Sequence, residues 1–215
     1  MQKINKSIAP DFFVKSKKRV KTPLTANAWS DPAIIPIRAN LREYILLEEQ
    51  FLLCCYCEQE IDSDPDNSNI DHFKKRDLFP RLTLDYNNLL ISCNSRNQCS
   101  SSKDSNKRHL RESDYKKIVH PVIDDPMLFF DFLLTGDIIA REGINNTDKL
   151  KAEYTIELFG LNCESLRVQR RSIAASIMNL KRHSNLSLGM ICDEFSDFTS
   201  FIQCIFYKIK MNNCK

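Results

Sequence analysis

The sequence lacks a long hydrophobic run, a large excess of charge and a nucleotide-binding loop. No stretch of about 18 apolar residues is present, and the first residues lack the apolar core and small-residue cleavage site of a signal peptide. The formal net charge of +3 is too small to indicate nucleic-acid binding by itself. No GxxxxGK(S/T) motif occurs. We therefore expect a cytoplasmic protein with no membrane contact and no nucleotide site of its own.

The positive charge that is present is concentrated near the amino terminus. Residues 1–21 contain many lysines and arginines and a single acidic residue, Asp11. Prolines recur as far as Pro36, and this predicts a basic, extended arm over residues 1–36. Two interpretations stay open: the arm contacts phosphates or an acidic partner, or it is a solvated terminus.

Apolar residues repeat with helical spacing directly after these prolines, which predicts a helix over residues 37–53. The sequence then changes to short apolar pieces separated by Asp, Asn, Ser and Pro. This pattern predicts loops and two short strands, at residues 69–73 and 89–92. We expect the chemistry to lie in this part, and we assign residues 37–110 to one core that includes the preceding helix.

The remaining part of the chain, residues 111–215, is predicted to be mostly helical and to pack on the core or on a partner. One helix is expected from Thr147, the candidate N-cap, to Gly160, the candidate stop. A second helix is expected from about Ser165, and a third over residues 189–210, where apolar residues recur at steps of three and four. Together the elements predict an α+β fold that is predominantly helical.

Nine cysteines are present, and their arrangement favours metal binding over disulfides. An odd number of cysteines in a chain with no secretion signal argues against a disulfide framework. Cys54 and Cys57 have the two-residue gap of a zinc knuckle, and Cys93 and Cys99 form a second, more widely spaced pair. The four predict a structural Zn²⁺ site, in which Cys55 could replace a neighbour. The alternative is that these cysteines are small buried hydrophobic residues.

Between the two cysteine pairs, Asp71 and His72 stand side by side at the end of a strand-like segment. At a strand end both side chains can approach one ion and one phosphate. Phosphodiester hydrolysis needs a base that activates water and a cation that stabilises charge on the phosphate. Neutral histidine suits the first role, and aspartate, a hard oxygen ligand for Mg²⁺, suits the second. By themselves the two residues are also compatible with an ordinary surface pair.

The motifs follow one another as CCYCEQEI, IDHFKKRDLFPRL, DYNNLLISC and CSSSK. This order resembles the HNH endonuclease superfamily, the ββα-metal nucleases. The flanking segments LREYILLEEQ, DDPMLFFDFLLTGDI and TIELFGLNCESLRVQRR make the chain more similar to the PtuB-like HNH subunits of Septu and retron-associated anti-phage systems. The resemblance implies a small ββα-metal core with a cysteine knuckle, embedded in flanking helices.

The resemblance also implies roles for individual residues. Asp71 would bind the catalytic metal, Mg²⁺ or Mn²⁺, and His72 would act as the general base. Asn88 would brace the loop between the two strands, with Asn87 as the alternative.

The third metal position of the superfamily, normally His or Asn, falls on Ser100 in this sequence. Serine is a poor ligand for Mg²⁺. Asn97, Asp104 or His109 would then supply the missing group.

Basic residues near the acid and the histidine are expected to contact phosphates of the substrate. Lys74, Lys75 and Arg76 directly follow His72, and Lys103 ends the CSSSK motif. The alternatives are a solvated charge run for the first three and an exposed lysine for the last.

Partners and activity complete what the resemblance implies. Proteins of this kind act with a PtuA-like ATPase, and retron-associated members with a reverse transcriptase and its RNA and DNA. We therefore expect a metal-dependent HNH endonuclease subunit that hydrolyses phosphodiester bonds of DNA or RNA in an anti-phage defence complex. The alternative is a catalytically weak, zinc-stabilised nucleic-acid-binding or adaptor subunit. The joint presence of Asp71, His72 and Asn88 favours catalysis, because an adaptor gains nothing from keeping all three.

Overall fold

The structure, a computed structural model, describes residues 1–105, 109–183 and 187–212. Its regular elements are mostly helices, accompanied by two small two-stranded sheets. The predicted α+β, predominantly helical fold is therefore confirmed. No helix in this described part is both long and apolar enough to span a lipid bilayer.

The amino-terminal elements are α1 (Asp11–Arg19), η1 (Ala26–Ser30), η2 (Ile35–Ile37) and α2 (Arg38–Glu48), of which η1 and η2 are 3-10 turns. The prediction of an extended arm is wrong for residues 11–19. Pro10 precedes α1, Asp11 lies in its first turn and basic residues fill its last turn, an arrangement that favours a helix. Phe13 is buried, so the arm packs on the rest of the protein.

Helix α2 ends at Glu48, before the predicted end at residue 53, because the chain turns sharply there. Phe51 and Leu52 have positive φ angles of 51° and 63°, a conformation that cannot continue a helix. The buried side-chain amide of Gln50 donates to the Ile91 carbonyl and accepts from the Ile91 N–H, both at 2.8 Å, as a neighbouring strand would. These bonds fix the start of the cysteine segment, residues 54–57, against the strand that contains Ile91.

Strands β1 (Ser68–His72) and β2 (Leu89–Cys93) form an antiparallel pair, and helix α3 (Cys99–Lys103) follows β2. Both predicted strands are confirmed. Asp71 pairs with Leu90 and His72 with Leu89 at the end of the ladder. The loop between the strands contains two 3-10 turns, η3 (Pro80–Leu82) and η4 (Tyr86–Asn88).

The carboxy-terminal elements are the 3-10 turns η5 (Glu112–Lys117) and η6 (Pro126–Leu128), strands β3 (Phe130–Phe132) and β4 (Ile138–Ala140), and helices α4 (Asn146–Leu158), α5 (Glu164–His183), α6 (Leu188–Glu194) and α7 (Thr199–Asn212). The side chain of Asn145 caps α4, so the prediction of Thr147 as the N-cap is wrong. Gly160, with a φ of 59°, follows the end of α4 as predicted.

The single helix predicted over residues 189–210 is also wrong, because α6 and α7 are separate. Phe198 has a φ of 58°, and its backbone N–H donates to the Glu58 carbonyl at 2.8 Å. The Ser200 N–H, in the first turn of α7, donates to the Glu58 carboxylate at 2.7 Å. The break between the helices therefore allows both backbone N–H groups to bind Glu58, the residue that follows Cys57.

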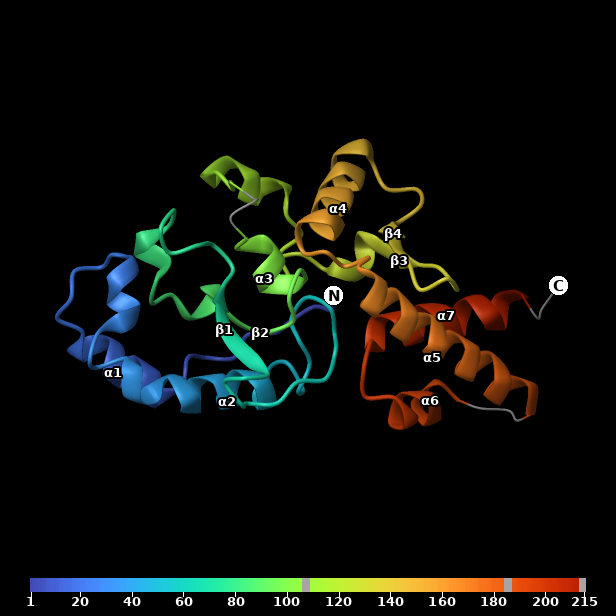
Figure 1. Cartoon of the computed structure of the whole chain (residues 1–215), viewed down its shortest axis with the longest axis horizontal. Helices are drawn as coiled ribbons and strands as arrows, with labels where there is room; N and C mark the ends of the chain where they lie inside the picture. Colours follow the sequence, from blue (N-terminus) through green and yellow to red (C-terminus); the bar gives the residue numbers. More distant parts are fainter. Residues whose placement is uncertain (106–108, 184–186, 213–215) are drawn as a thin grey trace.

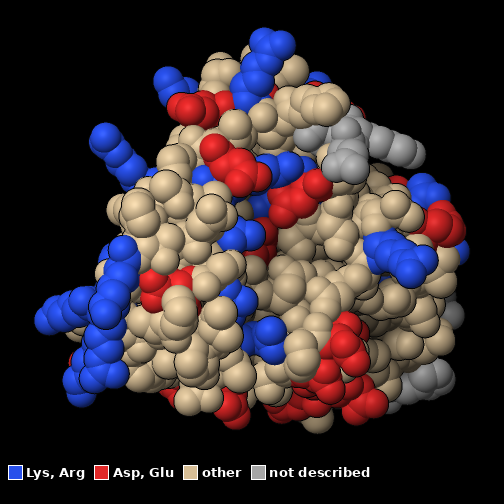
Figure 2. All heavy atoms as spheres, turned by 60° about the vertical axis from the view of Figure 1, so that its left-hand side comes forward, with Lys and Arg blue, Asp and Glu red and all other residues tan. Residues whose placement is uncertain are grey.

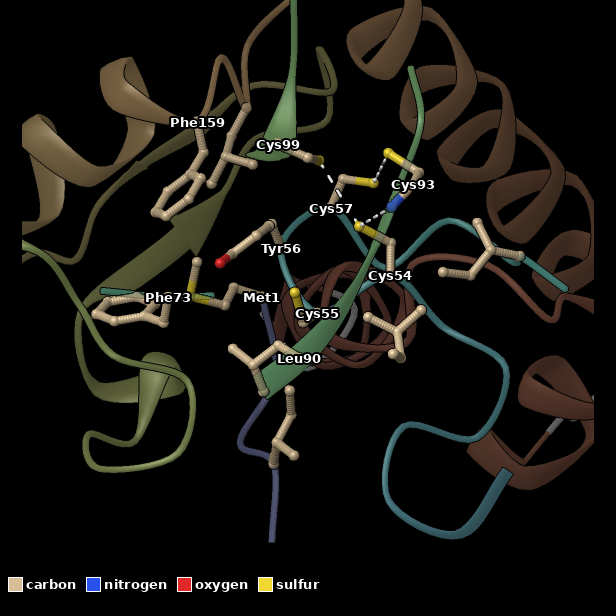
Figure 3. Close-up of a cluster of buried hydrophobic side chains, with 14 of the residues drawn as sticks. Met1, Cys54, Cys55, Tyr56, Cys57, Phe73, Leu90, Cys93, Cys99 and Phe159 are labelled. Carbon is tan, nitrogen blue, oxygen red and sulfur yellow. Dashed lines mark hydrogen bonds between the residues drawn. The ribbon is translucent and has the colours of Figure 1, made fainter. Parts of the chain in front are cut away.

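The core joins both ends of the chain to the cysteine segment. α1 and α2 lie on one side of the molecule and α5, α6 and α7 on the other, with α3 between them (Figure 1). Met1, Tyr56 and Phe73 are buried together in this middle region (Figure 3). The Tyr56 ring stacks on Phe159, which follows α4, with centroids 4.0 Å apart and planes inclined by 21°. The carboxy-terminal helices therefore pack directly on the core that contains the motifs.

Candidate functional site

Four cysteines meet at one point between the knuckle, β2 and α3. Cys54, Cys57, Cys93 and Cys99 are buried, and their sulfurs all lie within 4.8 Å of one another. The Cys54 and Cys99 sulfurs are 3.7 Å apart, and those of Cys57 and Cys93 are 4.0 Å apart. A tetrahedral zinc site with Zn–S bonds of about 2.3 Å has sulfurs about 3.8 Å apart. The four fit a Zn²⁺ ion, whereas the sulfur of Cys55 lies apart from them (Figure 3).

The surroundings of the cysteine cluster suit thiolates. Burial raises the pKa of the Cys99 thiol, so a cation is needed to keep it deprotonated. The Cys93 backbone N–H donates to the Cys54 sulfur at 3.3 Å, and Gln98 Nε2 donates to the Cys93 sulfur at 3.7 Å. Such donors stabilise a negatively charged zinc–thiolate centre and orient its ligands.

Asp71, in β1, accepts hydrogen bonds from two buried side chains. Lys103 Nζ lies 2.7 Å from both carboxylate oxygens, and the Tyr56 hydroxyl donates to Oδ2. Lys103 has no exposed surface, and its ammonium also donates to the His72 carbonyl at 2.7 Å. Burial and the charge of Asp71 raise the pKa of Tyr56, so its hydroxyl remains a donor. Lys103 thus pairs with Asp71 inside the protein, and does not project toward solvent as a phosphate contact would.

The His72 ring is held by a hydrogen bond and by an aromatic contact. Its Nε2 lies 2.9 Å from the carbonyl oxygen of Thr83. Because a carbonyl can only accept, Nε2 carries the hydrogen and Nδ1 keeps its lone pair. The Trp29 ring packs against the imidazole at 90°, with centroids 4.7 Å apart. Burial lowers the pKa of His72 to about 4, so the ring is neutral at physiological pH.

Asn88 connects the end of the loop between β1 and β2 with earlier parts of the same loop. Its Oδ1 accepts from the Lys74 backbone N–H at 2.8 Å, and its Nδ2 donates to the carbonyls of Lys74 and Leu82 at 3.0 Å and 3.2 Å. Asn87, the alternative, is exposed and makes none of these contacts. Asn88 therefore fixes the backbone that directly follows the histidine.

A cavity of about 290 Å³ opens beside β1, and its lining includes Asp71, His72, Asp104, Lys75 and Arg76. With Asp77, which also lines it, the cavity brings three carboxylates, a neutral histidine and two positive charges together. Figure 2, in which the side of the molecule with α1 and α2 comes forward, shows acidic and basic side chains gathered around a hollow. A larger cavity, about 550 Å³, lies between β4 and α4, but it contains no histidine or basic residue. The smaller cavity is therefore the one equipped for acid–base chemistry.

The candidates for the third metal ligand lie in different places. Ser100 is buried outside this cavity, and its hydroxyl is already hydrogen-bonded. Asn97 and His109 are exposed and do not line the cavity. Asp104 does line it, together with Asp71. Burial raises the pKa of Asp104. A bound cation would therefore favour its ionised form.

The three basic residues after His72 have different surroundings. Lys75 and Arg76 line the cavity, and Lys75 Nζ lies 3.3 Å from an Asp104 oxygen. The Lys74 ammonium lies over the Phe79 ring, 5.3 Å from its centroid. Two of the three predicted phosphate contacts are thus next to the candidate reaction site.

Two residues of the site gave no usable signal in the sequence. Trp29, the only tryptophan of the chain, reaches His72 only because the amino-terminal arm folds back over β1. Tyr56 lies between the knuckle cysteines, where an aromatic residue suggests core packing, yet its hydroxyl bonds to Asp71. Both roles depend on tertiary contacts.

Comparison with known proteins gives relatives of one kind, although no family model matches the sequence. The chain is 28% identical to the Septu protein PtuB of Bacillus thuringiensis, over 54% of this chain and 39% of PtuB. It is 26% identical to a predicted HNH endonuclease of retron Ec83 from Escherichia coli, over 86% of this chain and 84% of that protein. A predicted HNH endonuclease of retron Vc95 from Vibrio cholerae is also 26% identical, over 55% of this chain and 56% of that protein.

These relatives confirm the resemblance to HNH-type subunits of Septu and retron defence systems. The chain spans about two fifths of PtuB and somewhat more than half of the Vc95 protein.

Proposed function

We propose that this chain is an HNH endonuclease subunit that hydrolyses phosphodiester bonds of nucleic acid with His72 as the general base. The observation that carries the proposal is the fixed tautomer of His72: the Thr83 carbonyl holds Nε2–H, so Nδ1 is free to accept a proton. The ring lines the same cavity as Asp71. Two relatives are named as predicted HNH endonucleases.

The residues around His72 suit proton transfer from water. Nδ1 would accept the proton of a water molecule that attacks the phosphorus, and the Nε2–H bond to Thr83 would stabilise the imidazolium that results. Trp29 keeps the ring from rotating away. Asn88 holds the backbone after His72, so the base keeps its direction during the reaction.

A catalytic Mg²⁺ or Mn²⁺ ion would be held in this cavity by Asp71 and Asp104, and it would share the Asp71 carboxylate with the Lys103 ammonium. Mg²⁺ is commonly bound by one or two carboxylates, with waters and substrate phosphate completing the shell, so two protein ligands suffice. The ion would stabilise negative charge on the phosphate and the leaving oxygen. Ser100 and Asn97, the ligands expected from the sequence, lie outside this cavity.

The cysteine cluster would hold a structural Zn²⁺ ion through Cys54, Cys57, Cys93 and Cys99. The four ligands come from the knuckle, β2 and the first residue of α3. Zinc would therefore tie together the elements that position Asp71 and Lys103. A four-cysteine site leaves no open coordination position, which is typical of structural zinc.

The names of the relatives also support a role in anti-phage defence. We propose that the chain works in a complex with a PtuA-like ATPase, because one of its relatives is named as the Septu protein PtuB. In a retron setting, the reverse transcriptase and its RNA and DNA would be further partners. Co-purification of the chain with the ATPase, compared with each protein alone, tests this assembly.

The experiment that tests the activity is cleavage of plasmid DNA and total RNA by the zinc-loaded chain, with Mg²⁺ or Mn²⁺, alone and with the ATPase. We expect wild-type protein to cut one of the two and His72→Ala to lose at least a hundredfold in rate, the usual contribution of a general base, about 10²-fold to 10⁴-fold. His109→Ala, at an exposed histidine outside the cavity, is the matched control. Equal cleavage by wild type and His72→Ala would remove His72 from the mechanism.

A second candidate function is a zinc-stabilised adaptor that binds nucleic acid without cutting it. Two observations favour it: serine stands at the third metal position, and Lys103 already balances the charge of Asp71. An adaptor would bind nucleic acid equally well with and without Mg²⁺ and show no cleavage with any metal or partner. Cleavage that depends on His72 would reject this candidate.

A further inference from the structure

Two arginines from distant parts of the sequence are bound to the same turn of the amino-terminal arm. The Arg38 guanidinium donates to the carbonyl of Trp29, and Arg76 Nη1 donates to the carbonyl of Ala26 at 3.3 Å. Both carbonyls belong to η1. This turn therefore holds the first residue of α2 and the loop after β1 next to each other.

Neither guanidinium forms an ion pair within the part of the chain that the structure describes. Arg38 Nε is buried there without a hydrogen-bond partner. Burial lowers the pKa of Arg38, and the positive charge of Arg76 lowers it further. Asp71, Asp77 and Asp104 line the same cavity as Arg76, but no ion pair joins a carboxylate to either guanidinium among the described residues. The two like charges that the fold brings together would therefore favour binding of an anion.

This region adjoins the candidate reaction site. Trp29 separates Arg38 from His72: its ring lies 5.0 Å from the Arg38 guanidinium carbon and 4.7 Å from the His72 ring. Arg76 lines the cavity that also contains Asp71 and His72, and its charge acts on His72. An anion bound by the two arginines would therefore lie beside a phosphate that faces His72.

We propose that Arg38 and Arg76, which we call the arginine pair, bind a backbone phosphate of the nucleic acid next to the one that is cleaved. Guanidinium groups match the geometry of phosphate oxygens and can donate two parallel hydrogen bonds. Trp29 is 8% exposed, so its ring supports Arg38 and is not available to stack on a base. The pair would bind the backbone of any sequence, as a positioning contact. This inference rests on the proposed function, because it assumes a nucleic-acid substrate.

The test is the affinity of the zinc-loaded full chain for fluorescein-labelled oligonucleotides of DNA and RNA, without Mg²⁺ or Mn²⁺ so that no cleavage occurs. We expect Arg38→Gln and Arg76→Gln each to weaken binding of the preferred oligonucleotide by about tenfold, as expected for the loss of a hydrogen bond to a charged group. Each should also make the plot of log affinity against log salt concentration less steep by about one unit. That change corresponds to the loss of one phosphate contact. Arg38→Lys should restore part of the affinity, since it keeps the charge without the guanidinium fork.

Arg42→Gln is the matched control. Arg42 lies one turn further along α2, and it also donates to a carbonyl, that of Ser63 at 3.0 Å, and has a buried Nε without a partner. It differs in having no contact with η1 within the described residues. Unchanged binding by Arg38→Gln and Arg76→Gln, or an equal loss in Arg42→Gln, would overturn the proposal. If Arg38→Gln does not fold, as judged by Trp29 fluorescence and thermal melting, Arg76→Gln alone decides.

Two further comparisons separate the possible ligands and the two proposals. Inorganic phosphate should displace the oligonucleotide from wild type better than chloride of equal ionic strength, and this advantage should disappear in Arg38→Gln and Arg76→Gln. An advantage of phosphate that persists unchanged in both variants would overturn the proposal. Loss of binding in both variants without any cleavage by wild type would support the arginine pair and reject the nuclease. Cleavage by wild type with normal binding by both variants would support the nuclease and reject the pair.

Discussion

The ammonium of Lys103 lies among oxygens of Asp71, His72 and Phe73, away from solvent. A charge removed from water is tolerated only when it is paired and hydrogen-bonded, and both conditions are met here. Lys103 is the last residue of α3, and Cys99 of the cysteine cluster is the first. The lysine of the CSSSK motif therefore connects the end of α3 that contributes Cys99 to the cysteine cluster with the acidic residue of β1, and its ammonium fixes the Asp71 carboxylate.

His120 is a second buried histidine, and it does not line the cavity beside β1. Its ring packs on Phe73, with centroids 3.9 Å apart, and its Nδ1 accepts from the Val122 N–H at 3.1 Å. Burial lowers the pKa of His120 from 6.5 to about 4. The charged groups that act on it are Asp124, Lys74, Lys151 and Lys3.

A folded-state pKa below the unfolded value makes stability depend on pH, because the unfolded chain binds the proton more readily. The stabilisation is fully present above about pH 6.5 and is lost as the pH falls through the window to about 4, by on the order of 3 kcal/mol. We expect His120→Asn, which keeps an acceptor for Val122, to remove this part of the pH dependence.

The measurement is the free energy of unfolding of the zinc-loaded wild type and variant between pH 4 and 8. Other titrating groups contribute to both proteins and cancel in the difference. His109→Asn, at an exposed position, is the control and should follow wild type. Parallel curves for wild type and His120→Asn would contradict the prediction.

At the scale of elements, α3 depends on its surroundings. It has five residues, far fewer than the roughly 12 that an isolated helix needs in water. Cys99 attaches its start to the cysteine cluster, and Lys103 attaches its end to Asp71. The contacts at its two ends therefore stabilise α3, the helix that completes the ββα unit.

We expect removal of zinc to unfold this unit, since a structural zinc site contributes on the order of 10 kcal/mol to folding. Cys99→Ser should lose most of the bound zinc and melt at a lower temperature than wild type. The measurement is zinc content per chain together with thermal melting before and after chelation. Cys192→Ser, outside the cluster, should keep both at the wild-type level. A chelated protein that melts like wild type would show that the cluster holds no structural metal.

The elements that the sequence predicted correctly are those set by local patterns. β2 was predictable because it is a short apolar segment between polar turns, and β1 because Ile70 and Phe73 stand in a short stretch bounded by Asp, Asn and Ser. The break between α6 and α7 was not, because helical spacing of apolar residues continues across it. The break arises from the bond between Phe198 and Glu58, which are distant in the sequence. Helix α1 was hidden by the surrounding prolines, although its charges suit a helix.

The candidate site also contains residues that were predictable from local motifs and residues that were not. Asp71 and His72 were identifiable because they are adjacent within one motif. The placement of Asp104 at the cavity, with Ser100 outside it, depends on how α3 packs against β1. No spacing rule gives that packing, and it is also what turns Lys103 inward.

At the scale of the whole molecule, the amino-terminal arm is part of the fold. Lys3 Nζ donates to three successive carbonyls, those of residues 122–124, at 2.7 to 3.0 Å. The Ile4 N–H donates to the Pro121 carbonyl at 2.8 Å. Phe13 of α1 is buried against the ring of Tyr86, with centroids 5.8 Å apart. The basic residues of the amino-terminal arm therefore belong to a folded part of the protein.

Deletion of residues 1–21 should for this reason destabilise the protein as a whole. Ile4 and Phe13 are each 1% exposed, and burial of one such side chain contributes about 1.5–3 kcal/mol, a large share of a typical 5–15 kcal/mol stability. We expect the truncated chain to be poorly soluble or to melt without cooperativity in circular dichroism. A truncated chain that melts like wild type would show the arm to be independent of the core.

The corresponding test of charge alone is the double variant Lys17→Gln, Lys18→Gln, at two exposed positions of α1. It should melt within a few degrees of wild type, because surface substitutions usually change stability by less than about 0.5 kcal/mol. A loss of nucleic-acid or ATPase binding in this variant would assign that binding to the basic face of α1. The same loss in the deletion would follow from unfolding alone, so the deletion cannot identify a docking surface and the double variant can.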